Sequence, residues 1–423
     1  MIISSNQRPI APARLESGQS SVKTQTHEES PEVDVLERSR AQSETPLPTR
    51  VQMAQIVGKA STTASLKKLW SRPIRDIVGS GAKVRGGPLL SKDGKTTFLA
   101  SEAGLHALDS NTGETRWTFT AAGKGLSSNA LRLPSGSILT GDSEGGIHAV
   151  DAESGDVLWA GKVPDKPTSL QLASNGSVRV GTDNNRWRVA PGPRYGGDTR
   201  TFSPGDGQYG FGLDSHQVTW TSPIPAPQST PGNDGVFLGD ERKPLVAYRR
   251  ESEEPVWQRD IQTVSPPTVG NDGTLFVSSV EPARNFFALD PSNGEELWRF
   301  TSSEGHTALS GVLSEDGQTV YVAGGGPGHS GNLFALDTAT GKPRWQRALD
   351  TDTRMSPRVS EGKVALVSDS HQIYVIDGKN GDILARKKAE NYVFEAPDLS
   401  NGKLVLAAND SQVHAYEIPT SKE

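Results

Sequence analysis

The sequence predicts an all-β fold made of repeated four-stranded antiparallel sheets, and three observations support this prediction. An eleven-residue phrase recurs at roughly forty-residue intervals, as in ALDSNTGETRW from Ala107 and ALDTATGKPRW from Ala335. Asp-Gly and Asn-Gly pairs, which favour hairpin turns, recur with the same spacing. The 423 residues also include 45 Gly and 28 Pro, which suits many tight turns between short strands.

Residues 1–65 differ in composition from the repeats that follow. This segment is rich in Ser, Thr, Gln, Glu and Pro and has no sustained apolar period. Because it cannot bury enough apolar surface to offset its ordering entropy, we predict a disordered polar tail. It is either a solvated tail or a region for targeting or chaperone docking. The repeats occupy residues 66–420, which we predict to form the second domain.

Each repeat contains the pieces of one four-stranded sheet. A short first strand, often with Pro, leads through a tight turn to a second strand rich in apolar and β-branched residues. A third strand and an Asp-x-x-x-Gly turn then lead to a fourth strand that usually carries Trp. The first turn ends in Gly, which tolerates positive φ, at Gly94, Gly136, Gly176, Gly235, Gly273, Gly317, Gly362 and Gly402. Eight such turns predict eight sheets, and radial repetition of these sheets is a β-propeller.

The two ends of the repeat region complement each other. The segment from Lys67 to Ile74 carries Trp70 but has no strands before it, and the last repeat ends at Glu417 without a fourth strand. We therefore predict that Lys67 to Ile74 pairs with the strand Gln412 to Glu417. This pairing would close an eight-bladed propeller and leave no open edge. The longer gap between residues 176 and 235 predicts an insertion.

Charge and cysteine content exclude several classes of protein. A net charge of −6 and the absence of a Lys/Arg block argue against binding to nucleic acid or to an anionic membrane. With no Cys, the chain has no disulfide, thiolate nucleophile or Cys-ligated metal site. No apolar run is long enough for a membrane span, and the opening residues lack the pattern of a secretory signal. We expect a monomer that is cytoplasmic or exported by a signal-peptide-independent route.

The unit A-[LV]-D-x-x-[TSN]-G-x-x-x-W resembles the repeat of the pyrroloquinoline-quinone-type propellers, a family that includes quinoprotein alcohol dehydrogenases and BamB-like outer-membrane assembly lipoproteins. The resemblance implies that each Trp docks between neighbouring blades against an Asp-Gly turn. It places seven residues in structural docking positions, namely Trp70, Trp117, Trp159, Trp220, Trp257, Trp298 and Trp345. The match is weakest in the third and fourth repeats.

The same resemblance allows an enzymatic alternative. The quinoproteins of this family hold the quinone and a calcium ion in a pocket on the propeller axis, commonly capped by a disulfide between adjacent cysteines. This chain has no Cys and no long inserted cap. We therefore expect a protein that is not an enzyme and assign no catalytic, cofactor-binding or metal-binding residue. Pyrroloquinoline quinone with calcium remains the alternative cofactor.

Three histidines recur in the third strands and could suggest a ligand set. His106, His148 and His414 take the position that Phe287 and Phe334 take in other repeats. We interpret them as half-exposed amphipathic fillers and not as metal ligands, because equivalent positions diverge around a ring.

One further motif has a known chemical meaning elsewhere. Residues 326–331 match G-x-G-x-x-G, yet they join two strands, and no helix follows to hold a pyrophosphate. We interpret this segment as an exposed glycine-rich loop.

Loop length varies most between the repeats, and long loops on a rigid scaffold often bind partners. Segments 281–285, 324–331 and 191–215 are the long ones. Arg and aromatic residues in such loops are typical of interface anchors. The candidate partner-binding residues are Arg194, Tyr195, Tyr209, Arg284 and His329.

These observations favour a bacterial interaction scaffold that presents loops to a protein partner. A Ser-, Gln- and Pro-rich opening resembles type III secretion starts, so a secreted effector is the more specific hypothesis. The alternatives are a quinone-dependent dehydrogenase and a BamB-like outer-membrane assembly factor.

Overall fold

The computed structural model divides the chain into two units, residues 1–52 and 53–423, and all of the residues that it describes belong to the second unit. It describes residues 64–122, 124–172, 178–182, 188–189, 200–201, 208–212, 217–222, 229–231, 235–238, 244–249, 255–263, 267–281, 285–301, 307–308, 311–325, 331–353, 356–393 and 396–419. The predicted tail lies almost entirely outside these ranges.

The described residues confirm the all-β prediction and the four-stranded antiparallel sheets. Sheet 1 has β3 (Leu89–Leu90), β4 (Thr96–Ser101), β5 (Gly104–Asp109) and β6 (Thr115–Phe119). Sheet 2 has β7 (Leu131–Arg132), β8 (Ile138–Gly141), β9 (Gly146–Val150) and β10 (Val157–Lys162). Sheet 3 has β11 (Pro167–Leu172), β12 (Val178–Thr182), β15 (Gln208–Gly212) and β16 (Gln217–Ser222). Sheet 4 has β17 (Ser229–Pro231), β18 (Gly235–Leu238), β19 (Leu245–Arg249) and β20 (Pro255–Arg259).

The remaining sheets follow the same order along the chain. Sheet 5 has β21 (Gln262–Thr263), β22 (Thr268–Val269), β23 (Leu275–Glu281), β24 (Asn285–Leu289) and β25 (Glu296–Thr301). Sheet 6 has β26 (Thr307–Ala308), β27 (Val312–Leu313), β28 (Thr319–Gly325), β29 (Asn332–Asp337) and β30 (Pro343–Ala348). Sheet 7 has β31 (Arg358–Ser360), β32 (Lys363–Val367), β33 (Gln372–Asp377) and β34 (Ile383–Lys388). Sheet 8 has β35 (Asp398–Ser400), β36 (Lys403–Ala408), β37 (Gln412–Glu417) and β2 (Lys67–Pro73).

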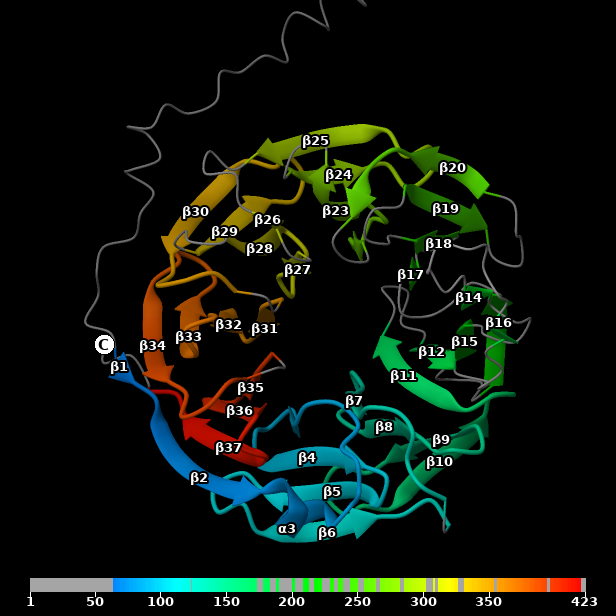
Figure 1. Ribbon diagram of the computed structural model, residues 1–423, viewed down its shortest axis with the longest axis vertical. Helices are drawn as coiled ribbons and strands as arrows, with labels where there is room; N and C mark the ends of the chain where they lie inside the picture. Colours follow the sequence, from blue (N-terminus) through cyan, green and yellow to red (C-terminus); the bar gives the residue numbers. More distant parts are fainter. Residues whose placement is uncertain are drawn as a thin grey trace, which may run out of the picture. The chain divides into compact units, whose positions relative to one another are not determined.

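The predicted pairing of the two ends is confirmed. Strand β2 runs antiparallel to β37, with Lys67 opposite Glu417 and Pro73 opposite Gln412 (Figure 1). The strand is one residue shorter than predicted because Ile74 begins the helix α3 (Ile74–Val78), the only helix among the described residues. That helix is far too short to cross a membrane.

Besides the fifth strands of sheets 5 and 6, two additions lie outside the four-stranded pattern. Strand β1 (Ala64–Ser65) pairs in parallel with the outer strand β34 of sheet 7, so the first described strand lies within the predicted tail, two residues before the predicted boundary. The long third repeat contains the small antiparallel pair β13 (Arg188–Val189) and β14 (Arg200–Thr201), at the predicted insertion.

The apolar core lies between neighbouring sheets. The second and third strands of a sheet are buried on both faces, as β4 and β5 show, whereas the outer strand β6 is largely exposed. Sheets therefore pack face to face, and their inner strands read as almost continuous apolar runs. Among the described residues, buried clusters fill seven junctions, between sheets 1–2, 2–3, 4–5, 5–6, 6–7, 7–8 and 8–1.

Candidate functional site

The Asp-x-x-x-Gly turn holds its shape through its own aspartate. In sheet 1, one carboxylate oxygen of Asp109 accepts the backbone N–H groups of Asn111 and Thr112 at 2.8 and 3.0 Å. The N–H of Gly113 then donates to the carbonyl of Asp109 at 2.8 Å. The second oxygen of the carboxylate is left to face outward from the turn. The motif therefore leaves one carboxylate oxygen available to a neighbouring donor in each repeat that carries it.

The turn also receives the tryptophan of the preceding sheet. The indole N–H of Trp70 donates to the carbonyl of Ser110 at 2.9 Å, and its ring lies against Gly113. The position requires glycine for two reasons. A Cβ on Gly113 would come within 2.7 Å of the indole, and the φ of Gly113 is +74°, which side-chain-bearing residues rarely adopt. The same indole-to-turn bond joins Trp117 to Glu153, Trp257 to Pro291, Trp298 to Thr338 and Trp345 to Gly378.

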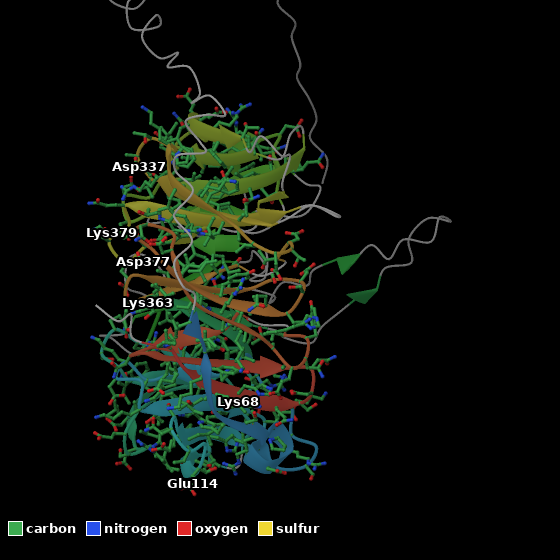
Figure 2. The ribbon with its side chains drawn as sticks, turned by 90° about the vertical axis from the view of Figure 1, so that its left-hand side faces the viewer. Lys68, Glu114, Asp337, Lys363, Asp377 and Lys379 are labelled. Carbon is green, nitrogen blue, oxygen red and sulfur yellow. The ribbon has the colours of Figure 1, made fainter. Side chains whose placement is uncertain are left out.

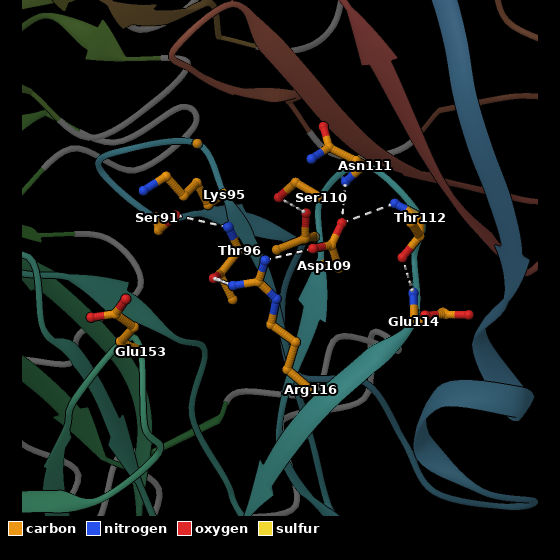
Figure 3. A network of polar contacts seen from close by, with 12 residues as sticks. Ser91, Lys95, Thr96, Asp109, Ser110, Asn111, Thr112, Glu114, Arg116 and Glu153 are labelled. Carbon is orange, nitrogen blue, oxygen red and sulfur yellow. Dashed lines mark hydrogen bonds and ion pairs between the residues drawn. The ribbon is translucent and has the colours of Figure 1, made fainter.

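A β-bulge precedes each of these tryptophans in the outer strand. In sheet 1, Trp117 pairs with Ala107 and Thr115 with Leu108, so Arg116 is the extra residue. Bulges redirect a side chain out of the regular alternation. Here the guanidinium of Arg116 reaches Asp109 Oδ2 at 2.5 Å and Thr96 Oγ1 at 3.2 Å (Figure 3). The bulge thus supplies a cation to the free oxygen of the turn.

Sheet 6 repeats this arrangement. Arg344 occupies the bulge and its guanidinium contacts Asp337 Oδ2 at 2.8 Å. The turns of sheets 6 and 7 lie on one side of the sheets, where Asp337, Asp377 and Lys379 are labelled (Figure 2). The aspartate-arginine pair is therefore a recurring feature and not an accident of one sheet.

Sheet 2 has the turn but not the arginine. Asp151 accepts the backbone N–H groups of Glu153 and Ser154 at 2.9 and 2.8 Å, which lowers the pKa of its carboxyl group and keeps it ionised. The bulge residue is Leu158, whose exposed fraction is 55%, beside Val157 at 47%. Among the described residues, no cation forms an ion pair with Asp151.

A cavity of about 570 Å³ lies at this place, between sheets 1 and 2. On the sheet 1 side it is lined by Lys92, Lys95 and Arg116, and on the sheet 2 side by Asp151 and Glu153, together with Ser137 and Leu158. Lys95 is paired with Asp93 at 3.3 Å. This is the candidate functional site: a polar cavity with an acidic wall and an exposed apolar edge.

A second cavity, of about 310 Å³, occupies the equivalent place between sheets 6 and 7. There Lys379 stands where sheet 2 has Glu153, since each is the second residue after the turn aspartate. The two cavities therefore share a geometry but differ in charge.

The three histidines are more buried than predicted, which corrects the half-exposed interpretation. His106 and His414 are 4% and 2% exposed, and the side chain of His148 is 16% exposed. Both ring nitrogens of His106 have partners, Ser101 Oγ at 3.0 Å and Thr118 Oγ1 at 3.2 Å. The reason is that third strands lie between two packed sheets.

A cluster of three ionisable side chains, which the sequence did not predict, includes His414. Its Nε2 lies 3.0 Å from Asp410 Oδ2, and the ligand atoms of Glu390, Asp410 and His414 all lie within 4.8 Å of one another. The ammonium group of Lys68 already contacts Glu390 at 2.8 Å. Because a cation neutralises this carboxylate and Ser71 holds the other ring nitrogen of His414, we assign no metal to the cluster.

The predicted partner-binding residues cannot be placed in a site. Arg194, Tyr195, Arg284 and His329 lie outside the described residues, and for Tyr209 the description covers only its backbone in β15. The docking residue Trp220 is likewise described only through its strand, β16. The cavity residues were missed because the repeat was interpreted as structural throughout. The available signal was the residue seven positions after the turn aspartate, which is Arg in two repeats and Leu in others.

His106 supplies a prediction for the pH dependence of stability. Burial lowers its pKa from 6.5, and the charge of Arg72 lowers it further. The unfolded chain therefore takes up a proton that the folded chain resists, so stability is expected to fall as the pH drops below 6.5. Urea unfolding above and below this pH should show the loss, and His106→Gln should reduce it. An unchanged slope in the variant would assign the effect to other groups.

Comparisons with known proteins agree on one architecture. Residues 55–208, 176–360 and 354–423 match the family described as outer membrane protein assembly factor BamB. No curated protein matches the chain. Among solved structures, it is similar to the C-terminal WD40 domain of Sif2, at 12% identity and a TM-score of 0.57, covering 85% of this chain and 100% of that one.

Two further solved structures are similar. The computationally designed protein Ika8 has 12% identity and a TM-score of 0.55, with 83% of this chain and 100% of that chain covered. BamB from Moraxella catarrhalis has 15% identity and a TM-score of 0.48, with 83% and 99% covered. The first two likenesses show the fold, a β-propeller of four-stranded antiparallel sheets.

Proposed function

This chain belongs to the family described as outer membrane protein assembly factor BamB, and on that premise we propose that it is a non-enzymatic propeller scaffold that binds a protein partner. The observation that carries the proposal is the cavity between sheets 1 and 2. Its lining combines the carboxylate of Asp151, which has no ion-pair partner among the described residues, with the exposed side chain of Leu158, and the exposed Val157 precedes Leu158 in the chain. Exposed apolar surface next to polar groups is typical of the anchoring regions of protein interfaces.

We propose that the scaffold is a closed ring of eight blades. Eight sheets of four or five strands occur among the described residues, and β2 pairs with β37 across the chain ends. Buried clusters fill seven of the eight junctions, and the side chains at the eighth, between sheets 3 and 4, are largely outside the described residues. Closure by strand pairing would remove the open edges of the first and last sheets.

The carboxylates of the innermost described strands bear on the enzymatic alternative. A calcium ion that helps to hold a quinone needs ionised carboxylates. In the innermost described strands, Asp398 of β35 is the one carboxylate, and burial raises its pKa. Its Oδ2 already accepts the N–H of Leu90 at 2.8 Å and lies 3.5 Å from Arg132. These residues do not fit a calcium ion that holds a quinone, and this supports the proposal of a non-enzymatic scaffold.

The scaffold proposal predicts that the purified protein will neither bind pyrroloquinoline quinone with calcium nor reduce an artificial electron acceptor with alcohols or sugars as donors. The physical reason is that Asp398 is engaged by Leu90 and Arg132. The measurement is a quinone titration by absorbance, followed by a dye-reduction assay. A known quinoprotein serves as the positive control. Saturable quinone binding at micromolar concentration would overturn the proposal.

As the more specific form, we propose a type III-type secreted effector, which would be cytoplasmic in the bacterium and exported without a signal peptide. The support is the Ser-, Gln- and Pro-rich composition of residues 1–65. Removing this segment should abolish delivery into host cells while the remaining protein stays folded. Delivery of the truncated protein would contradict the effector role.

A role in outer-membrane assembly is the second candidate, because the family carries that description.

A further inference from the structure

We propose that the cavity between sheets 1 and 2 is an arginine seat, which receives the guanidinium of an arginine side chain from the protein partner. Asp151 and Ser137 would bind the guanidinium, and Val157 and Leu158 would pack against an apolar neighbour of that arginine. The inference rests on the proposed scaffold function and names the chemistry of the partner.

The first argument is an internal comparison between sheets. In sheet 1, the guanidinium of Arg116 is held by Asp109 Oδ2 at 2.5 Å and by Thr96 Oγ1 at 3.2 Å. In sheet 2, Asp151 stands at the place of Asp109, and Ser137 stands at the place of Thr96 at the end of the first hairpin turn. Both line the cavity. The acceptors of the seat are present.

The second argument is that no described residue fills this seat. The bulge residue that carries the guanidinium in sheets 1 and 6 is Leu158 in sheet 2. Among the described residues, neither Asp151 nor Glu153 has an ion-pair partner, although Asp151 is held as an anion by two backbone N–H groups. A cation from outside the chain would complete the arrangement seen in the other two sheets.

The third argument concerns the charge and the shape of the ligand. Two cations of the sheet 1 wall are already neutralised, Arg116 by Asp109 and Lys95 by Asp93. Asp151 and Glu153 outnumber the one remaining lysine, Lys92, so a cation is favoured over a phosphate or carboxylate. Arginine is favoured over lysine because a planar fork can bond a carboxylate and a hydroxyl together, as Arg116 does.

The fourth argument is the apolar edge of the cavity. Leu158 lines the cavity and Val157 precedes it in β10, and the two are among the most exposed large apolar side chains of the described residues, at 55% and 47%. An apolar side chain beside the bound arginine would remove this surface from water. The expected recognition element is therefore an arginine followed or preceded by a large apolar residue in an extended peptide.

The test uses the full-length protein and the dipeptide amide acetyl-Arg-Leu-amide as the probe. Titration followed by amide resonances should shift the signals of residues 151–159 and saturate. The same peptide with citrulline in place of arginine has nearly the same shape without the charge, so it should bind at least about tenfold more weakly. Equal binding of the two peptides, or shifts elsewhere only, would overturn the arginine seat.

Two substitutions locate the charge. Asp151→Asn keeps an oxygen that can accept the N–H groups of Glu153 and Ser154, so the turn is retained while the anion is lost. It should weaken binding of the arginine peptide by about tenfold. Glu114→Gln is the matched control, because it removes an exposed acid of the neighbouring sheet 1 turn that does not line the cavity. Equal affinity in both variants would contradict the proposal.

A third substitution fills the seat from within the chain. Leu158→Arg places a guanidinium at the bulge, as in sheets 1 and 6, and should both abolish binding of the peptide and raise the melting temperature. A rise in melting temperature shows that the variant is folded, so the loss of binding then reports occupancy of the seat. Retained peptide binding in this variant would overturn the proposal. The quinone experiment is unaffected by any of these results and decides the scaffold function separately.

Discussion

Replacing Trp298 by alanine is expected to lower the free energy of unfolding by about 3–5 kcal/mol. The indole lies against Gly341 of the next sheet and donates its N–H to the carbonyl of Thr338 at 2.8 Å. Its ring centre is 5.8 Å from that of Phe276 and 6.1 Å from that of Phe286. Its loss would therefore leave a void between sheets 5 and 6 and an unpaired carbonyl.

The measurement is equilibrium unfolding in urea, and His148→Ala is the comparison. His148→Ala removes the contact to Asp142 at 2.8 Å and a tilted ring contact with Phe119 at 5.4 Å between ring centres, whereas the Asp142 carboxylate keeps the backbone N–H groups of Glu144 and Gly146. The expected cost is about 1–2 kcal/mol. Equal costs for the two substitutions, or a larger cost for His148→Ala, would contradict the view that the tryptophan carries the contact between sheets.

The order of the strands could be predicted from the sequence because the same pattern of turns and strands recurs in successive repeats. Each repeat marks its hairpin with a tight turn and its outer strand with the Asp-x-x-x-Gly phrase. The pairing of β2 with β37 follows from two incomplete repeats, one of which is the lone Trp70 strand. Burial was less predictable. His106 looked amphipathic in one strand, but its surroundings depend on a second sheet packed against it.

The candidate site could not be predicted because it depends on a difference between repeats. The phrases ending in Arg116-Trp117 and Leu158-Trp159 look like two versions of one structural motif. Only the structure shows that Arg116 reaches from the bulge to the aspartate of its own turn and that Leu158 occupies the equivalent bulge position. The change from arginine to leucine then leaves Asp151 with no ion-pair partner among the described residues.

Removing residues 1–73 is expected to destabilise the protein by more than about 5 kcal/mol, whereas removing residues 1–65 should leave its stability almost unchanged. The longer deletion removes β2, which pairs with the full length of β37, and Trp70, which packs between sheets 8 and 1. The shorter deletion removes only β1 from the described strands and keeps the buried Leu66.

The two truncated proteins are compared by thermal and urea unfolding. If β2 closes the ring, hydrogen exchange at the β37 amides should speed up in the longer deletion, since Arg72 and the residues around it no longer cover that edge. A synthetic peptide of residues 67–73, the deleted strand, added to the longer deletion should restore part of the stability, which separates loss of one strand from general misfolding. A longer deletion as stable as the shorter one would show that the ring does not depend on this pairing.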